Sequence, residues 1–359
     1  MVGKLDDDPV STDRPDRRLH SRWLAPILAS AILLAGLGGC GSEDPGPEPE
    51  AVQRPSPDAS IPEQPPSGPV LPGFTGQAGK QLRREVARAD QKKMNPDVFA
   101  KVGDSNTEWP QNLYGLGCRE IGFGSNGGLK DVVKRYSQVQ FPDLGSLSDC
   151  LPVNSLTRRS AATVSGVWTE WLMTPTAELP ATGIAPPTEE CEPQQTPLDC
   201  EIGLIAPRWV LIMTGTNDAL LGRPLGDTFR GLLEQMVNRV RELGPVPVLS
   251  TLPPMETPAH NGEAGDQRIG EANRIIRRVA DRMKVPLIDL NVALSAPGMV
   301  DRGLAPDGLH LGAYGGDDQP DIMRGSAMLT IPGLKYGANR RNLIWLQVLD
   351  RLDRAAGRD

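Results

Sequence analysis

The feature that most constrains the fold is an uninterrupted apolar run at residues 209–213, Trp-Val-Leu-Ile-Met. A run of this length suits a β-strand buried on both faces. Similar runs occur at 246–249 and 285–290, and amphipathic patterns typical of helices lie between them, at 227–243 and 269–283. Strands that alternate with helices predict a three-layer α/β/α sandwich with a central, mostly parallel sheet.

Elements before and after this region complete the pattern. Residues 81–91 have helical periodicity, a first strand is expected at about 97–102, and residues 339–353 form a closing helix. Asp227 is expected to cap the helix that follows the 209–213 strand, and Gly244 to end it. The chain is therefore predicted to contain one large catalytic or binding domain, at 74–359.

The amino-terminal residues 1–39 have the pattern of a secretory signal peptide. An apolar run at 23–37 follows Arg17, Arg18 and Arg22, and it is too short to span a bilayer comfortably. The run ends in Leu-Gly-Gly-Cys at Cys40, which resembles a bacterial lipobox and implies cleavage before Cys40 and its lipidation. An ordinary signal peptide and an uncleaved membrane anchor are the alternatives.

The segment that follows Cys40 is predicted to be a tether. Residues 41–73 contain ten prolines together with Gly, Ser and Glu, a composition typical of disordered, partly polyproline linkers. With Cys40 this tether, 40–73, would hold the domain away from a membrane. The net charge of −7 argues against a nucleic-acid partner, because phosphate binding needs basic patches.

Four cysteines remain in the domain, and an even number in an exported protein suggests two disulfides. The sequence permits three pairings, of which we favour Cys191 with Cys200 and Cys118 with Cys150. Metal binding is the alternative, although no Cys-x-x-Cys spacing is present. The pair Cys191 and Cys200 lies in a Pro- and Thr-rich stretch, 174–207, that we interpret as a surface insertion able to fold over a site as a lid.

A serine follows the first predicted strand. Gly103 allows a sharp turn, and Ser105 then lies just past the carboxyl end of the strand, where open parallel α/β sheets bind ligands. Asn217 follows the 209–213 strand in the same way, and its amide could donate a hydrogen bond to a developing oxyanion. Alone, each of these residues is equally compatible with an ordinary turn.

A histidine and an aspartate lie three residues apart on a later loop. An aspartate at position 307 can accept the Nδ1 hydrogen of His310 and fix its tautomer, which leaves Nε2 free to take a proton from a serine. A purely structural hydrogen bond is the alternative for His310. His260 has no carboxylate at a helpful spacing and is expected to be an exposed loop residue.

Together these stretches resemble the SGNH, or GDSL-type, serine hydrolase family, whose fold is flavodoxin-like. Gly-Asp-Ser at 103–105 matches its first block, Gly-Thr-Asn-Asp at 215–218 its third, and Asp-Gly-Leu-His at 307–310 its last. The resemblance implies a Ser105–His310–Asp307 triad and an oxyanion hole built from Ser105, Gly166 and Asn217. Gly166 fits the second block only loosely, and Ser160 or Gly145 could occupy that place instead.

The resemblance implies a serine esterase that needs no metal or organic cofactor. We expect it to hydrolyse short-chain acyl esters, including O-acetyl groups of carbohydrate, because aromatic residues make up only 4% of the chain and offer little surface for a fatty chain. The expected partners are a small-molecule or polysaccharide ester and, through the lipid anchor, a membrane. The expected location is the bacterial cell envelope, facing the periplasm or the exterior. A glycan O-acyltransferase, a lipase and a non-catalytic binding lipoprotein are the alternatives.

Overall fold

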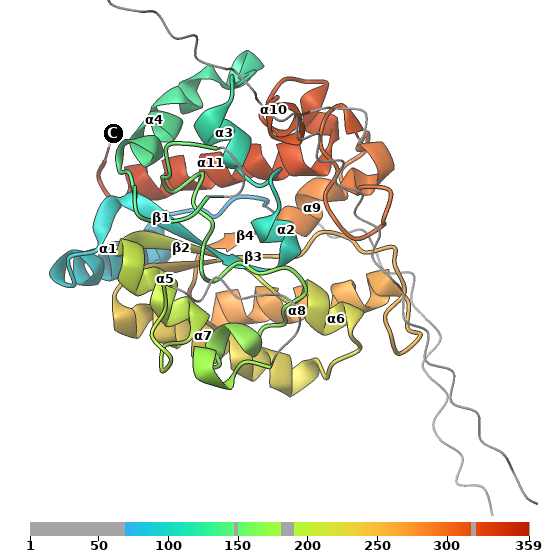
Figure 1. The fold of residues 1–359 in the computed structure, drawn as a ribbon, viewed down its shortest axis with the longest axis horizontal. Coiled ribbons are helices and arrows are strands. Elements are labelled where there is room, and N and C mark those ends of the chain that lie inside the picture. The colour runs from blue at the N-terminus through green and yellow to red at the C-terminus, as the bar shows by residue number, and fades with distance from the viewer. Residues whose placement is uncertain (1–68, 147–149, 181–189, 317–320, 359) are drawn as a thin grey trace, which may run out of the picture. The chain divides into compact units, whose positions relative to one another are not determined.

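A computed structural model describes residues 69–146, 150–180, 190–316 and 321–358. The predicted signal peptide, Cys40 and most of the tether lie outside the described residues. A four-stranded parallel sheet forms the centre (Figure 1), in the order β1-β2-β3-β4. The strands are β1 Asn95–Gly103, β2 Pro207–Met213, β3 Val246–Ser250 and β4 Leu287–Ile288.

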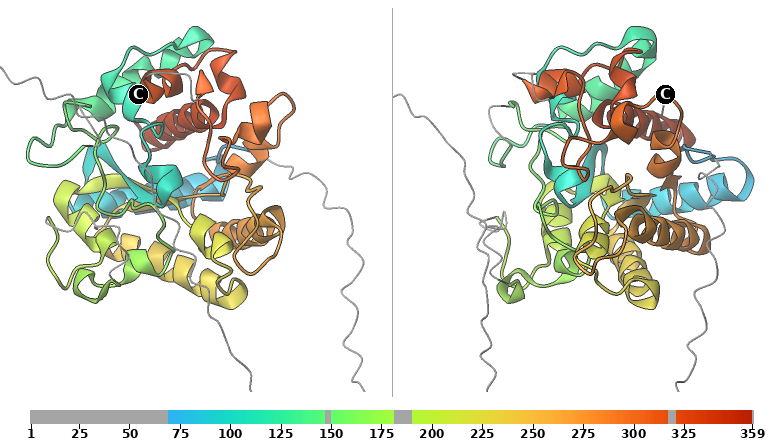
Figure 2. Two further views of the ribbon diagram at one scale, coloured as in Figure 1. Left: turned by 45° about the vertical axis from the view of Figure 1, so that its right-hand side comes forward. Right: turned by 90° about the vertical axis from the view of Figure 1, so that its right-hand side faces the viewer.

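Helices cover both faces of this sheet, as the sequence predicted. In Figure 1 one group lies below the sheet: α5 Pro197–Ile205, α6 Thr216–Leu220, α7 Gly226–Leu243 and α8 Gly265–Met283. Above it lie α4 Lys130–Gln138 and α11 Gly337–Ala355, while α1 Gly76–Gln91 packs against β3 and α11. Figure 2 shows the same layers after rotation. The short helices are α2 Ser105–Glu108, α3 Tyr114–Cys118, α9 Leu290–Leu294 and α10 Ile322–Ser326.

The core lies between these layers and explains why the strand predictions succeeded. Every residue of β2 and β3 is buried. Neither strand has a solvent-facing side, so apolar and polar residues do not alternate along it. The helices place apolar side chains of their stripes against the sheet, including Phe229, Leu233, Met236, Val237 and Val240 of α7. Gly244 ends α7 at a positive φ of 126°, a conformation that glycine adopts without a Cβ clash.

Three predicted boundaries need correction. The stretch 174–207 is not a surface insertion throughout, because its last part forms α5, whose Leu198, Ile202 and Ile205 are buried in the core. Asp227 lies in the first turn of α7 and does not cap it. The expected strand at 285–290 is shorter, since α9 begins at Leu290.

The carboxyl-terminal end of the predicted tether belongs to the domain. Within residues 69–73, the carbonyl of Val70 accepts a hydrogen bond of 2.8 Å from the amide of Asp289, directly after β4. Val70 and Leu71 pack against the core. Composition alone missed these contacts, because the prolines of this segment dominate its sequence pattern.

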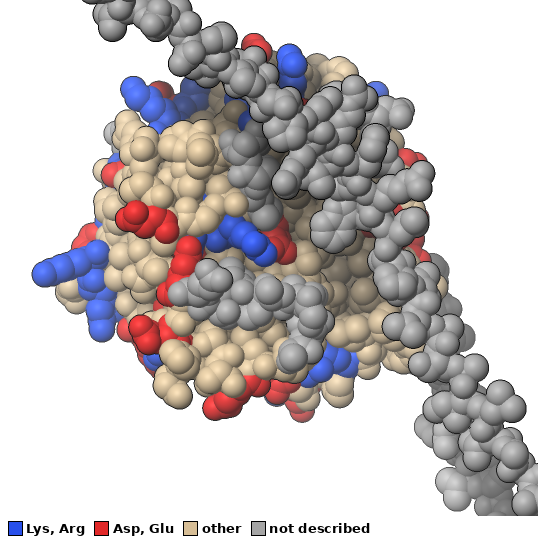
Figure 3. All heavy atoms as spheres, in the orientation of Figure 1, with Lys and Arg blue, Asp and Glu red and all other residues tan. Residues whose placement is uncertain are grey.

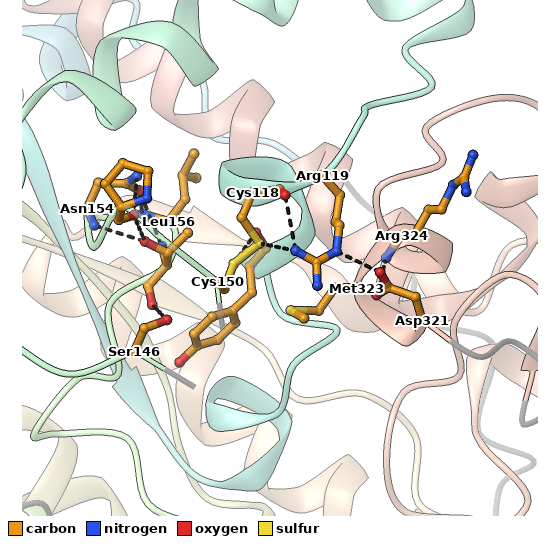
Figure 4. The surroundings of a disulfide bond; sticks show 12 residues. Cys118, Arg119, Ser146, Cys150, Asn154, Leu156, Asp321, Met323 and Arg324 are labelled. Atoms are coloured by element: carbon orange, nitrogen blue, oxygen red, sulfur yellow. Dashed lines mark hydrogen bonds and ion pairs between the residues drawn. A yellow bond between two sulfur atoms is a disulfide. The ribbon is translucent and has the colours of Figure 1, made fainter. Parts of the chain in front are cut away.

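The structure contains both of the disulfides that we favoured from the sequence. Cys118 joins Cys150 across 32 residues, and Cys191 joins Cys200 across nine. Figure 4 shows the first of them at the end of α3, where Arg119 donates a hydrogen bond to the Sγ of Cys118 and forms an ion pair of 2.6 Å with Asp321. The disulfide therefore ties α3 to the segment at Cys150, and the ion pair of the next residue, Arg119, ties the same end of α3 to the start of α10.

Charged residues of both signs share the surface. On the face seen in Figure 3, acidic and basic side chains lie interspersed among uncharged residues. Among the described residues, no helix combines the length and apolar character that crossing a bilayer requires.

Candidate active site

Ser105 lies where the sequence placed it, at the carboxyl end of β1. The last residue of β1, Gly103, pairs in register with Met213, and a Cβ at Gly103 would collide with the carbonyl of Met213 and with Thr107. Only glycine fits this approach between the two strands. Asp104 then caps α2 by accepting a 3.0 Å hydrogen bond from the amide of Asn106, and Ser105 is the first residue of that helix.

The structure brings Ser105, His310 and Asp307 together across 205 residues of sequence. The Nε2 of His310 lies 2.8 Å from the Oγ of Ser105, and its Nδ1 lies 2.5 Å from Oδ2 of Asp307. The other oxygen of Asp307 accepts backbone hydrogen bonds from Leu309 and His310 itself. One carboxylate thus holds both the ring and the backbone of the histidine.

Asp307 is arranged to remain ionised. Burial favours its neutral form, but the hydrogen bonds from the His310 side chain and from the backbone amides outweigh this effect, and the pKa of Asp307 is lowered. Gly308 gives the turn its shape, with a φ of +67°. An ionised carboxylate at Nδ1 fixes the tautomer in which Nε2 can accept a proton.

Asn217 contacts the segment that carries Gly166. The segment before Gly166 runs along the outer edge of β1, where Thr163 forms a parallel bridge with Gly103. Asn217 follows β2 in α6, and its Nδ2 donates a 2.9 Å hydrogen bond to the carbonyl of Val167. That contact uses one of its two amide hydrogens. The residues predicted for an oxyanion hole therefore come from adjoining segments.

Two buried carboxyl groups lie beneath these loops. Burial raises the pKa of Asp104 to about 6, against the opposing hydrogen bonds from Thr216 and Asn106, and nearby Asp218 raises it further. Burial also raises the pKa of Asp218, although Thr169 donates backbone and hydroxyl hydrogen bonds of 2.9 Å to its Oδ2. These groups hold the loops that follow β1 and β2.

The residues after Ser105 form a polar network that no sequence pattern singled out. The Oε2 of Glu108 accepts hydrogen bonds of 2.6 Å from both the amide and the hydroxyl of Ser165, the neighbour of Gly166. Arg159 forms an ion pair of 3.2 Å with the other oxygen of Glu108. The indole of Trp109 stacks on the ring of His310. One signal was available, because Glu108 and Trp109 lie three and four residues after Ser105, one helical turn away.

This arrangement can carry out nucleophilic chemistry. A serine hydroxyl at hydrogen-bond distance from an imidazole whose other nitrogen faces a carboxylate can lose its proton as it attacks an electrophilic carbon. Within the ranges that the structure describes, no group of three or more His, Cys, Asp and Glu side chains could hold a metal ion. His260, in contrast, is exposed on its loop, and its described hydrogen bond comes from the backbone amide.

Comparison with known proteins places part of this site in a family. Residues 184–317 match the family described as GDSL-like Lipase/Acylhydrolase, a stretch that includes Asn217, Asp307 and His310. Ser105 lies before the matched residues. A search of curated proteins found no match.

Solved structures similar to this chain include three hydrolases. A GDSL-like lipase from Bacteroides thetaiotaomicron is 14% identical over 75% of this chain and 98% of its own, with a TM-score of 0.41. An acetylxylan esterase from Geobacillus stearothermophilus is 18% identical over 70% and 93%, with a TM-score of 0.38. A lipase/acylhydrolase from Enterococcus faecalis is 23% identical over 53% and 74%, with a TM-score of 0.34.

Proposed function

The chain belongs to the SGNH/GDSL hydrolase family, and on that premise we propose that it is a serine esterase with Ser105 as its nucleophile. The observation that carries this proposal is the line of contacts from Ser105 Oγ to His310 Nε2, at 2.8 Å, and from His310 Nδ1 to Asp307, at 2.5 Å. An array of this kind supplies the nucleophile, the general base and the group that orients the base, which together allow acyl transfer through a serine.

In the proposed mechanism Ser105 Oγ attacks the ester carbonyl carbon while His310 Nε2 takes the hydroxyl proton. Asp307 stabilises the imidazolium that forms, and the tetrahedral intermediate collapses as His310 returns the proton to the leaving alcohol. Water then attacks the acyl-enzyme by the same route, which releases the carboxylic acid and restores Ser105. The amides of Ser105 and Gly166 and the side chain of Asn217 serve as the oxyanion donors.

The proposed substrates are esters with a short acyl group, acetyl to butyryl. Ser105 keeps only 6% of its surface exposed and Asn217 the same fraction, which supports a narrow approach to the nucleophile. O-acetyl groups of carbohydrate are the proposed natural esters, because the exposed polar side chain of Glu256 lies beside the loop of His310, where the Glu256 backbone amide donates a 2.8 Å hydrogen bond to the carbonyl of Gly308.

We place the enzyme outside the cytoplasm, lipid-anchored in the bacterial cell envelope through Cys40. The signal-like residues 1–39 and the sequence before Cys40 motivate this proposal. The two disulfides support it, since such bonds persist mainly in oxidising compartments. Metabolic labelling with a palmitate analogue should mark the wild-type protein and not a Cys40→Ala variant. Equal labelling of both would contradict the anchor.

A fluorophosphonate probe and a panel of p-nitrophenyl esters test the proposed activity. The wild-type protein should be labelled and should hydrolyse acetyl to butyryl esters with the highest kcat/KM, while Ser105→Ala should do neither. Release of acetate from acetylated polysaccharide tests the carbohydrate substrate. A kcat/KM that rises steadily from acetyl to palmitoyl would indicate a lipase, and labelling of Ser105→Ala would refute the assignment of the nucleophile.

A further inference from the structure

We propose that Asn106 and Trp109 are positioning residues that align His310 with Ser105, Asn106 through the backbone of the histidine and Trp109 through its ring. This inference rests on the proposed function and adds to it a means of holding the general base. The sequence gave no hint of the role of Asn106, because a residue directly after a catalytic serine needs no part in the chemical steps.

Asn106 binds the backbone on both sides of His310. Its Oδ1 accepts a hydrogen bond of 3.1 Å from the amide of Leu311, and its Nδ2 donates one of 3.2 Å to the carbonyl of Leu309. A single amide side chain therefore pairs with the histidine loop as a neighbouring strand would. A hydrophobic side chain at this position could supply neither bond.

Asn106 is itself held in place by the core. Its backbone carbonyl accepts a hydrogen bond from the guanidinium of Arg341, which is fully buried in α11. The same guanidinium donates a 3.1 Å hydrogen bond to the carbonyl of Gln111, whose side chain donates in turn to the carbonyl of Leu311 at 3.3 Å. Helix α11 therefore supports, through Arg341, the two side chains that bind the His310 loop, Asn106 and Gln111.

Trp109 holds the imidazole ring. The two rings are stacked, with their centroids 3.6 Å apart and their planes inclined by 17°. The indole is fixed from its other end, because Nε1 donates a 3.2 Å hydrogen bond to the Oγ of Ser165, which Glu108 binds. Rotation of the His310 ring out of line with Ser105 would break this stack.

Such positioning matters because the loop that carries His310 is only partly packed against the core. The side chain of Asp307 is 43% exposed, so the core does not enclose the carboxylate that orients the ring. A displacement of about 1 Å in a catalytic group can cost about 10²-fold in rate. Asn106 and Trp109 both lie within four residues of Ser105, so they tie the general base directly to the segment that carries the nucleophile.

Kinetics on four variants and a control test the proposal. Asn106→Ala should lower kcat by about 30- to 100-fold and leave KM within about threefold of wild type, since the acyl and alcohol sites are unchanged. Asn106→Asp keeps an acceptor for the amide of Leu311, so its kcat should fall less than that of Asn106→Ala. Trp109→Leu should lower kcat about tenfold, and Trp109→Phe, which can still stack, should restore most of that loss.

The matched control is Asn126→Ala. Asn126 also donates a side-chain amide hydrogen bond to a backbone carbonyl, that of Leu329 at 2.8 Å, but this bond involves neither the Ser105 segment nor the His310 loop. It should keep the wild-type kcat. The rate of fluorophosphonate labelling should follow kcat through all five proteins, because phosphonylation uses the same Ser105–His310 pair. Should Asn106→Ala not fold, as circular dichroism would reveal, Asn106→Asp carries the test.

An NMR measurement gives a readout that needs no turnover. The chain has three histidines, so the ring protons of His310 can be assigned with a His310→Gln variant. A stacked indole shifts these resonances upfield, and Trp109→Leu should abolish the shift while Trp109→Phe retains part of it. Wild-type kcat and labelling rates in both Asn106→Ala and Trp109→Leu, or an unshifted His310 ring in the wild type, would overturn the positioning role. A wild-type protein that hydrolyses and labels nothing would instead overturn the proposed function, and the NMR comparison would still decide whether Trp109 holds the ring.

Discussion

The two halves of the candidate active site are built in opposite ways. Ser105 follows a buried strand, and its immediate neighbours Asp104, Asn106 and Thr107 are all buried. Asp307 and His310 lie on a loop with an exposed carboxylate, and backbone and side-chain hydrogen bonds determine its shape. The core therefore positions the proposed nucleophile, whereas polar contacts position the proposed general base.

The carboxyl groups of the two halves differ accordingly. Burial raises the pKa of Asp104 to about 6 on the side of the nucleophile. On the loop, hydrogen bonds overcome the smaller burial and lower the pKa of Asp307. The difference teaches that two aspartates of one site can have different tasks: Asp104 shapes a turn in the core, and Asp307 supplies charge where the proposed imidazolium would form.

The strongest test of the comparison removes one member of each half. Ser105→Ala and His310→Ala should each lower kcat/KM by at least about 10⁴-fold with the fold intact, because the two residues act as a unit in proton transfer. Ester hydrolysis and fluorophosphonate labelling measure the loss, and thermal melts check the fold. A His310→Ala variant that keeps a tenth of the wild-type rate would show that another base serves Ser105. Asp307→Ala should be milder than either.

Asn217 belongs with Ser105 to the core-built half, at the end of the neighbouring strand. Asn217→Ala should lower kcat by about 10²- to 10³-fold with little change in KM, as expected when one oxyanion donor is lost. Steady-state kinetics on p-nitrophenyl acetate measure both constants. An unchanged kcat would mean that Asn217 serves only to hold the carbonyl of Val167.

The contribution of each disulfide to the free energy of unfolding should increase with the length of the loop that it closes. On loop entropy alone, loss of Cys118–Cys150 should cost about 4 kcal/mol of unfolding free energy, and loss of Cys191–Cys200 about 2.5 kcal/mol. The first bond braces the segment after the nucleophile helix, so the larger effect falls on the core-built half. Urea unfolding of the two double Cys→Ala variants gives the comparison, and the reverse order would contradict it.

The last test separates the two aspartates by the pH dependence of stability, an effect that is present only over part of the pH range. Because the pKa of Asp104 is raised on folding, the folded state binds more protons than the unfolded state between about pH 4 and pH 6, and stability falls as pH rises through that window. Asp104→Asn should remove this fall, which is about 3 kcal/mol at most. The lowered pKa of Asp307 has the opposite effect, because it stabilises the folded state at pH values above the ordinary aspartate pKa. Asp307→Asn should therefore lower the unfolding free energy in that higher pH range. Unfolding free energies at pH 4, 5, 6 and 7 measure both, and parallel curves for wild type and Asp104→Asn would contradict the assignment.

Much of the fold follows from local sequence patterns. The apolar runs at 209–213 and 246–249 became buried strands, and the amphipathic stretches at 227–243 and 269–283 became α7 and α8. Turn chemistry placed Ser105 and Asn217 after their strands, and the three-residue spacing of Asp307 and His310 foretold their contact. These predictions succeeded because residue periodicity and turn preferences act over only a few residues.

What the tertiary structure alone decided depends on contacts between distant residues. Proline and threonine hid the helix α5 within 174–207, because its place in the core depends on packing against β1. The approach of His310 to Ser105 spans 205 residues, and the bonds from Asn106 to Leu309 and Leu311 span a similar length of chain. No local pattern encodes these pairings, since they arise when parallel strands bring their carboxyl ends to one edge of the sheet. The sequence by itself was enough to propose Ser105, His310 and Asp307, and the fold determined which neighbours hold them in line.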